Sequence, residues 1–250
     1  MTIKILRLLL MGWLFFLLIG CSSVSDPDQP VYPGDPLENF NRAIWKVNYE
    51  YLDPYIARPV SLAYVDYVPR PMRHGLANVL SNIEEPASMI NNILMGNGQK
   101  AVDHFNRFWI NSTFGLLGMI DIASRAGINK HDDKQFGDVA GYYGVGNGPY
   151  LMLPGYGPYT VREVADTVDG WYVPLAYLNI WASLGKWAIQ GMESRAALVS
   201  HEGMLHRSPD PYALTREIYL QRRDFKAERD LPQYDAEQED FLDDYLEFGF

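Results

Sequence analysis

Apolar side chains recur at intervals of three or four positions along most of this 250-residue chain. The first stripe contains Leu37, Phe40, Ile44, Val47 and Tyr51, which the 3.6-residue repeat places on one face of a helix. Five later segments show the same spacing: residues 76–83, 89–94, 101–109, 187–196 and 212–225. Alternating apolar and polar residues, the pattern of a half-buried strand, are nearly absent. The pattern predicts a mainly α protein, built as a single multi-helix domain over residues 35–230.

Capping residues mark where several of these helices begin. Asp35-Pro36-Leu37-Glu38 predicts a helix start with Asp35 as its cap, and Asp210-Pro211 predicts another. Thr160-Val161-Arg162-Glu163 has the Ser/Thr-x-x-Glu form of a capping box. The prolines between these signals, at positions 54, 59, 69, 71 and 86, are expected to divide the chain into short helical pieces.

The last predicted helix, which begins at Asp210-Pro211, carries apolar and basic side chains on different faces. The side expected to face the core holds Tyr212, Ile218, Tyr219 and Phe225. The side expected to face outward holds Arg216, Arg222, Arg223 and Lys226. This arrangement is the one expected of an amphipathic helix on a water-soluble protein.

Two stretches contain no charged residue, residues 108–120 and residues 170–185. As a helix, the first would be ~20 Å long, short of the ~30 Å needed to cross a hydrocarbon core. A buried core helix is the more ordinary interpretation. The alternative is a helix that lies partly within a bilayer.

Residues 137–159 have a different composition from the rest of the chain, with seven glycines and five tyrosines in 23 positions. So many glycines predict a loop-rich segment with backbone positions at φ > 0. Gly144, Gly146 and Gly148 lie within five residues and form a candidate gating loop. Static tight turns explain the same glycines equally well.

The N-terminal residues 1–20 have the form of a secretory signal, with Lys4 and Arg7 before a short apolar stretch. Cys21, the only cysteine in the sequence, follows this stretch directly. Leu18-Ile19-Gly20-Cys21 resembles a bacterial lipobox, which predicts cleavage before Cys21 and covalent lipid on that residue. Residues 21–34 then form a polar tether between lipid and domain.

Charge excludes one class of partner. Without residues 1–20, the chain keeps 19 Lys and Arg against 31 Asp and Glu, a net charge of −12. A chain this acidic is a poor general binder of nucleic acid. Residues 231–250 contain seven of the acidic residues and no basic one. This acidic tail is expected to be either a solvated extension or an amphipathic segment that docks a partner.

No stretch of the sequence carries a convincing catalytic or metal-binding motif. His201 and His206 are five residues apart, so on a helix they diverge instead of sharing a zinc ion. The glycines of residues 144–149 lack the lysine and hydroxyl of a phosphate-binding loop. Asp166 and Asp169 are expected on a solvated helix face. We therefore expect no enzyme activity, no metal, and no cofactor beyond the lipid on Cys21.

Short motifs in the same order as in a known family run along the chain. They include Asp35-Pro36-Leu37-Glu38-Asn39-Phe40-Asn41-Arg42, Leu52-Asp53-Pro54-Tyr55, Glu84-Glu85-Pro86, Tyr143-Gly144-Val145-Gly146-Asn147-Gly148-Pro149-Tyr150 and Ser208-Pro209-Asp210-Pro211-Tyr212. Together they resemble the MlaA/VacJ family of outer-membrane lipoproteins over residues 35–225. A departure is Glu163, where the family commonly has Asp.

The resemblance implies a ring- or disc-shaped helical protein embedded in the outer membrane, with a central amphipathic channel. It also implies that the protein removes mislocalised phospholipids from the outer leaflet, next to a trimeric porin. The lipid would pass to a soluble periplasmic lipid carrier, which maintains lipid asymmetry. The anchor on Cys21 would lie on the periplasmic side.

A lipid channel needs polar points for the head group, and three residues are candidates. Asn111 and Asn179 interrupt the uncharged runs, and Lys186 stands at the end of the second run beside Trp187. The alternatives are caps or hydrogen bonds within helices for the asparagines, and a side chain extending to the interface for Lys186. Two other functions also remain open at this point: an anchored scaffold without transport activity, and a lipid hydrolase without a recognisable nucleophile.

Overall fold

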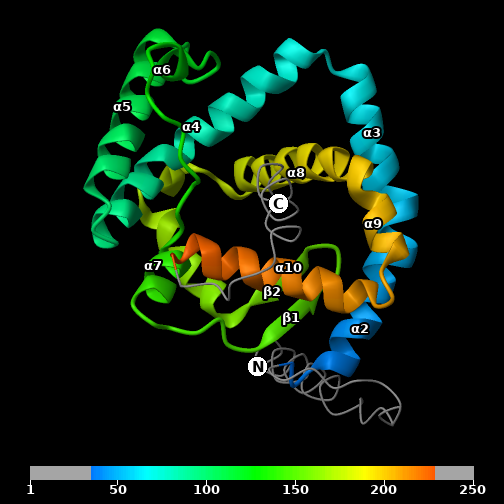
Figure 1. Ribbon diagram of the computed structural model, residues 1–250. Helices are drawn as coiled ribbons and strands as arrows, with labels where there is room; N and C mark the ends of the chain where they lie inside the picture. The colour runs from blue at the N-terminus through cyan, green and yellow to red at the C-terminus, as the bar shows by residue number, and fades with distance from the viewer. Residues whose placement is uncertain (1–34, 229–250) are drawn as a thin grey trace, which may run out of the picture.

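The computed structural model describes residues 35–228. Cys21, the signal and tether at residues 1–34, and the acidic tail at residues 231–250 lie outside the described residues. The described part is mainly helical, as predicted (Figure 1).

The first three helices join end to end as one rod, α2 (Glu38–Lys46), η1 (Val47–Ala57) and α3 (Arg58–Tyr67). The backbone stays right-handed helical across both junctions. Pro54 does not break the rod because η1 has wide π-type turns, which tolerate the missing N–H. The break comes only at Val68, which is extended before Pro69, as steric clash with the proline ring requires.

The longest helix, α4 (Arg70–Leu94), continues through Pro86. The predicted division at this proline is therefore wrong. Helix α4 packs along the next helix, α5 (Gly98–Phe114), and this tertiary packing outweighs the local cost of the proline.

The remaining elements are shorter. They are α6 (Ile122–Arg125), α7 (Phe136–Tyr142), β1 (Tyr150–Leu153), β2 (Gly157–Thr160), η2 (Val161–Trp171), η3 (Leu175–Tyr177), α8 (Ile180–Ala197), η4 (Leu198–His201), α9 (Glu202–Arg207) and α10 (Pro211–Lys226). Strands β1 and β2 pair as an antiparallel hairpin with Tyr150 opposite Thr160. The hairpin and α7 occupy much of the segment that the glycines had predicted to be loop.

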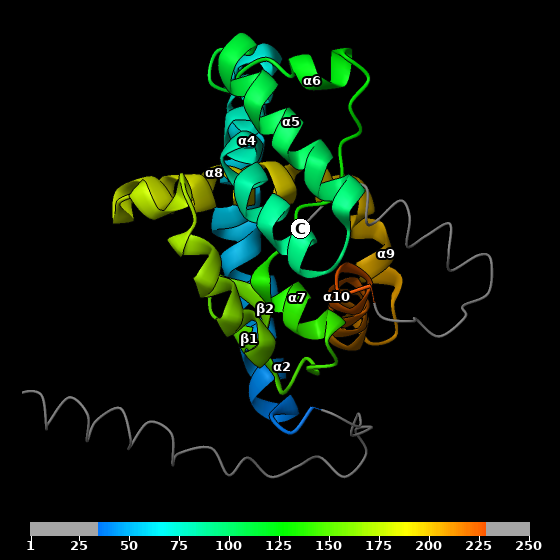
Figure 2. The same cartoon turned by 90° about the vertical axis from the view of Figure 1, so that its left-hand side faces the viewer.

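In Figure 1, α2 and α3 form one side of the molecule, α4 runs along the top, and α5 lies on the opposite side. The shorter α7 and the hairpin lie below, and α8 and α10 cross the view between these elements. Figure 2 shows that the N-terminal end of α8 extends to one side of the other helices.

Polar side chains, more than apolar ones, fill the interior of the described residues. The buried polar and charged positions include Asn41, Asn82, Glu85, Asn91, Asn92, His104, Arg107, Asn111, Asp138, Arg162, Asp169, Arg216 and Arg223. Many large apolar side chains are instead exposed. Phe40 and Tyr51 of the first predicted apolar stripe are exposed. The polar residue Asn41, which is next to Phe40 and outside the stripe, is fully buried. This polarity is opposite to that of an ordinary water-soluble helical domain.

A conventional apolar core occurs only locally among the described residues. Tyr150, Met152 and Tyr212 bury almost all of their surface where α2, β1 and α10 meet. We call this cluster, with the side chains packed around it, the aromatic corner. Tyr150 and Tyr212 meet edge to face at 6.3 Å, a favourable geometry for aromatic rings.

Several predictions about helix capping and burial are wrong. Asp35 does not cap α2; it accepts hydrogen bonds from Asn41 and from the hydroxyl of Tyr212. In α10, Arg216 and Arg223 are buried, whereas Phe225, predicted inside, is exposed. Long-range acidic partners explain the buried arginines, and local periodicity cannot reveal such partners.

Candidate functional site

An extensive apolar surface covers the outside of the described helices. Its most exposed members, at half or more of their surface, are Tyr51, Tyr55, Ile56, Val60, Tyr67, Met72, Ile93, Val102, Phe105, Trp109, Phe114, Leu116, Leu117, Met119, Tyr143, Val145, Tyr156, Val164, Trp171, Val173, Tyr177, Ile180 and Trp181. Monomeric soluble proteins rarely expose contiguous apolar patches of more than a few hundred Å². A surface of this composition therefore indicates contact with lipid or with a partner protein.

The first uncharged run is not a buried core helix: residues 108–114 end helix α5, and residues 115–120 form a turn with exposed apolar side chains. Helix α5 ends at Phe114, and Leu116 and Leu117 then adopt positive φ values of 54° and 59°. The two side chains are 66% and 74% exposed, so the predicted core helix over residues 108–120 is wrong. Gly118, at φ 96°, lies so close to Asn82 of α4 that a Cβ atom would clash with it.

The second uncharged run is also exposed, but it is rich in aromatic residues. Trp171, Tyr177 and Trp181 each leave more than three quarters of their surface exposed. Tryptophan and tyrosine are enriched where proteins meet the head-group region of a membrane. The run includes η3 and the N-terminal end of α8, the part that extends sideways in Figure 2.

Behind the apolar surface of α4 and α5 lies a buried ionic network. Glu85 of α4 accepts from Nε of Arg107 at 3.0 Å and contacts Nδ1 of His104 at 2.5 Å. Arg107 also donates to Asp121 at 2.8 Å. Burial alone would raise the pKa of Asp121, but hydrogen bonds from Ser124 and Arg107 hold that pKa well below its usual value. We call Glu85, His104, Arg107 and Asp121 the α4–α5 network.

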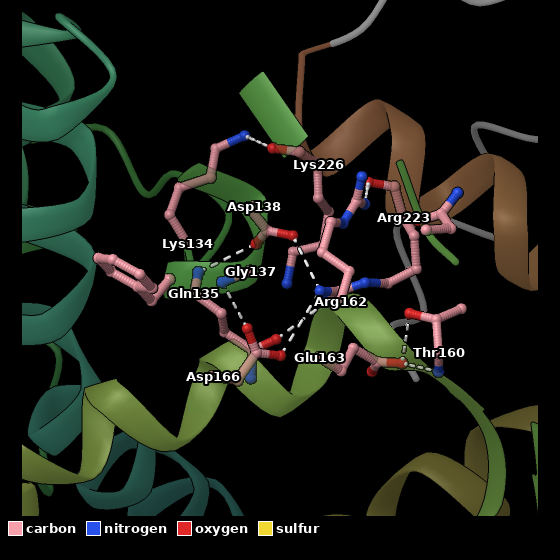
Figure 3. Close-up of polar contacts among 12 residues, drawn as sticks. Lys134, Gln135, Gly137, Asp138, Thr160, Arg162, Glu163, Asp166, Arg223 and Lys226 are labelled. Atoms are coloured by element: carbon pink, nitrogen blue, oxygen red, sulfur yellow. Dashed lines mark hydrogen bonds and ion pairs between the residues drawn. The ribbon is translucent and has the colours of Figure 1, made fainter. Parts of the chain in front are cut away.

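A second polar cluster joins α7, η2 and α10 (Figure 3). Asp166 of η2 accepts from the backbone N–H of Gly137 at 2.6 Å, and Asp169 accepts from that of Phe136 at 3.0 Å. Arg223 of α10 lies 3.5 Å from Asp166 and 3.4 Å from Asp138. The two η2 carboxylates thus bind the start of α7, and the predicted solvated face for them is wrong.

Burial raises the pKa of Asp166 to about 7, although Arg223 and the Gly137 N–H oppose this shift. Burial also raises the pKa of Asp169. The cluster therefore holds the start of α7, the helix that leads into the glycine-rich loop.

The candidate gating loop follows α7 directly. The predicted positive φ is present at Gly144 (93°) and Gly148 (70°). The hydroxyl of Tyr143 donates to the carbonyl of Leu94 at the end of α4, at 2.7 Å. A Cβ atom at Gly144 or at Gly146 would have no neighbour within 4 Å, so this part of the loop is not tightly packed.

The three candidate head-group residues lie in separate places. Asn111 is buried beside the α4–α5 network, donating to Asp121 at 3.1 Å and accepting from the N–H of Ala123 at 2.9 Å. Asn179 caps α8, since its side chain accepts from the N–H of Ala182 at 2.9 Å. Lys186 forms an ion pair with Glu84 of α4 and donates to Gln190 at 3.2 Å.

Within residues 35–228, no group of histidine, cysteine and acidic side chains is arranged to hold a metal ion. His206 instead contacts the hydroxyl of Tyr49 at 3.0 Å. None of the described helices is long and apolar enough to pass through a membrane.

Sequence reasoning did not identify the α4–α5 network. A signal was present, because Asn82, Glu85, Ser88 and Asn92 follow one another at helical spacing along α4. Such a polar stripe is ordinarily assigned to solvent, and here it is the buried face.

Comparison with known proteins gives consistent results. The family described as MlaA lipoprotein matches residues 33–226. The intermembrane phospholipid transport system lipoprotein MlaA of Escherichia coli (strain K12) is 43% identical over 236 residues, covering 91% of this chain and 93% of that protein. The protein of the same name from Haemophilus influenzae is 39% identical, covering 84% of this chain and 85% of its own length.

A solved structure is also similar. It concerns the structural basis for maintenance of bacterial outer membrane lipid asymmetry, and it matches with a TM-score of 0.75 at 49% sequence identity. The match covers 77% of this chain and 98% of that one.

Proposed function

The chain belongs to the MlaA lipoprotein family, and we propose that it removes mislocalised phospholipids from the outer leaflet of the outer membrane. The observation that carries this proposal is the reversed polarity of the fold. Apolar side chains such as Trp109 and Leu117 are exposed, while Glu85 and Arg107 are buried. A lipid environment stabilises the first arrangement, and a path for polar head groups requires polar groups inside.

The helices are proposed to form a ring or disc embedded in the membrane around an amphipathic channel. The exposed aromatic run at residues 171–181 suits the interfacial edge of such a protein. We propose that acyl groups on Cys21 anchor the chain on the periplasmic side. Several buried acyl chains hold a protein firmly, at ~0.8 kcal/mol per CH₂.

Two protein partners belong to this proposal. We propose that part of the exposed apolar surface contacts lipid and that another part contacts a trimeric porin in the same membrane. A soluble periplasmic lipid carrier would receive the lipid. The proposed reaction is transfer of intact lipid without covalent chemistry, so the chain is not proposed to be an enzyme.

A deletion strain tests the function. Loss of this protein is expected to expose phospholipid on the cell surface, measured by the susceptibility of outer-leaflet lipid to an added phospholipase. Expression of the intact chain should restore the barrier, and Cys21→Ser should not. An outer leaflet free of phospholipid in the deletion strain would contradict the proposed function.

Lys186 stays a candidate head-group residue, and its ion pair with Glu84 makes a sharper test possible. Lys186→Glu removes the cation but also brings two carboxylates together. The double variant Glu84→Lys with Lys186→Glu restores the ion pair and moves the cation to α4. We call removal of phospholipid from the outer leaflet outer-leaflet clearance. If a cation at position 186 itself binds phosphate, the double variant remains defective in outer-leaflet clearance. If the ion pair is only structural, the double variant recovers clearance.

The gating role of Gly144, Gly146 and Gly148 is proposed together with the function. Gly148 approaches Val161 of η2 so closely that its Cβ would lie 3.1 Å from the Cβ of Val161. After a shift of a few tenths of an ångström, a disulfide between Gly148→Cys and Val161→Cys would pin the loop to η2. Outer-leaflet clearance should fall on oxidation and return on reduction. Equal clearance in both redox states would leave the glycines as static turns.

A further inference from the structure

A small polar pocket lies between α4, α5 and the residues on either side of α6. It is lined by Asn78, Ser81, Asn82, Glu85, Arg107, Asn111, Asp121 and Lys130. It has room for about one water-sized group. A methyl-substituted or branched group would not fit at its base, but a single ammonium group would.

Asn82, which lines the pocket, carries an acceptor that has no hydrogen-bond partner among the described residues. Asn82 is 4% exposed, and its Oδ1 is buried and unpaired. Its Nδ2 donates to Oγ of Ser112 at 2.9 Å, which fixes the amide with Oδ1 on the other side. A buried amide oxygen without a donor is costly, so this position favours a ligand that donates hydrogen bonds.

The charges at the base of the pocket favour a cationic donor. Glu85 and Asp121 contribute two carboxylates, and Arg107 contributes one guanidinium. The guanidinium N–H groups are directed to Glu85, Asp121 and Ser124, so they satisfy acceptors already present. Asp121 already accepts hydrogen bonds from Arg107, Asn111 and Ser124 on both of its oxygens. An ammonium can therefore donate to Asn82 and to the lone pairs that remain on Glu85.

Toward the mouth of the pocket, the lining side chains are hydrogen-bond donors instead of acceptors. Lys130 is exposed there, and Ser81 supplies a hydroxyl on the α4 side. A cation and a hydroxyl donor are suited to a phosphate oxygen. The pocket therefore combines an acceptor-rich base with a cationic mouth, which matches a zwitterion whose ammonium enters first.

An apolar surface for acyl chains borders the same pocket. The exposed turn at residues 115–120 lies on α4, where Nδ2 of Asn78 donates to the carbonyl of Met119 at 3.3 Å. Gly118 packs directly against Asn82. Leu117 and Met119 are exposed beside these two pocket residues.

We propose that this pocket binds the phosphoethanolamine group of an aminophospholipid, with the ammonium on Asn82 Oδ1 and Glu85, and with Asp121 adding negative charge nearby. The phosphate lies near Lys130, and the acyl chains lie over the exposed turn. The proposal rests on the proposed phospholipid transport and adds a head-group preference to it. Phosphatidylcholine is disfavoured because its quaternary ammonium is larger and donates no hydrogen bond from nitrogen.

Lipid retention by the intact purified chain tests the proposal. Mixed micelles would contain dioleoyl phosphatidylethanolamine, phosphatidylcholine or phosphatidylglycerol, and retained lipid would be counted by native mass spectrometry. Loss of one hydrogen bond to a charged group corresponds to about tenfold, so the ethanolamine lipid should be retained about tenfold more tightly than the choline lipid. Equal retention of these two lipids overturns the pocket proposal.

Variants separate the pocket from general lipid binding. Lys130→Glu changes an exposed side chain and should weaken retention of the ethanolamine lipid severalfold. Lys46→Glu, the same charge change on exposed α2, is the matched control and should have no effect. Asn82→Asp keeps an acceptor and adds negative charge, so it should preserve or strengthen retention. Equal weakening by Lys130→Glu and Lys46→Glu overturns the proposed contact between Lys130 and the lipid phosphate.

Soluble phosphoethanolamine distinguishes a lipid site from a site for the free head group. It should displace the lipid only at far higher concentration, because it lacks contact with Leu117 and Met119. Displacement at equal concentration overturns the contribution of the turn. Failure of the proposed function gives a different result: the deletion strain keeps a phospholipid-free outer leaflet whichever lipid is retained in micelles.

Discussion

The aromatic corner and the α4–α5 region are built on opposite principles within one chain. In the corner, Tyr150, Met152 and Tyr212 bury their rings and thioether as in any soluble protein. Along α4 and α5, Glu85 and Arg107 are buried while side chains such as Trp109 face outward. The corner is held by apolar burial together with hydrogen bonds to Asp35 and Asn41, and the α4–α5 region is held by ion pairs behind an apolar exterior.

This difference indicates which regions depend on the surrounding solvent. Burial of apolar surface stabilises the corner in water at ~25 cal/mol per Å². The exposed apolar side chains of α4 and α5 are not removed from water on folding, so they add no stability in water. These helices therefore depend on lipid outside and on the ionic network inside. Variants in the two regions should therefore respond differently to lipid and to pH.

The largest effect is expected from Glu85→Ala. The variant leaves Arg107 and His104 buried without their shared carboxylate, which costs about 3–5 kcal/mol of unfolding free energy. Thermal unfolding in detergent, followed by circular dichroism, measures the loss. Glu50→Ala is the control, because Glu50 forms only an exposed 3.8 Å pair with Lys46 and should cost less than 1 kcal/mol. Equal stability of the Glu85 and Glu50 variants would contradict a structural role for the network.

Helical content and local signals could be predicted from the sequence. The Thr160–Glu163 capping box is present, and Asp210 caps α10 by accepting from the N–H of Ala213. Positive φ at Gly144 and Gly148 was also predictable, because glycine is the usual residue for such backbone. These features depend on neighbours within a few residues, so the sequence alone contains them.

The inward direction of each helix could not be predicted. A 3.6-residue repeat separates an apolar from a polar face, but it does not say which face meets the interior. Arg223 was placed outside because its partners Asp138 and Asp166 are more than 50 residues away in sequence. Asn82 and Asn111 were similarly indistinguishable from surface or capping asparagines until α4 and α5 were packed together.

A smaller effect, and a pH-dependent one, is expected from Asp166→Asn. The folded-state pKa of about 7 is above the unfolded value near 4, so ionisation penalises the folded state increasingly as pH rises from 4 to 7. The neutral variant avoids this penalty while its side-chain oxygen can still accept from Gly137. It should be more stable than the natural chain at pH 8, by on the order of 2 kcal/mol, and this advantage should shrink toward pH 5. Unfolding transitions at both pH values provide the measurement; an advantage independent of pH would contradict the assigned ionisation.

Leu117→Asn tests whether the exposed turn of the α4–α5 region contacts lipid. Asparagine tolerates the positive φ at this position better than leucine, so stability in detergent should be kept. Binding of the unacylated chain to liposomes should weaken by about 1–2 kcal/mol, or roughly tenfold, because one apolar side chain leaves the lipid. Met152→Asn, in the aromatic corner, should instead lower stability even in detergent. Unchanged liposome binding by the Leu117 variant would place the turn outside the bilayer.

The smallest effect concerns Asn179, where a helix cap and a head-group contact predict different results. As a cap, the residue needs only the oxygen that accepts from the N–H of Ala182. Asn179→Asp keeps an acceptor, whereas Asn179→Ala removes it and should cost about 1 kcal/mol. As a head-group contact, the residue needs its amide N–H₂ to donate to phosphate, and the aspartate would repel phosphate. Thermal unfolding and outer-leaflet clearance should therefore be measured together on both variants. Normal clearance and stability for Asn179→Asp, with a small stability loss for Asn179→Ala, would leave Asn179 as a cap, since only the oxygen is then required.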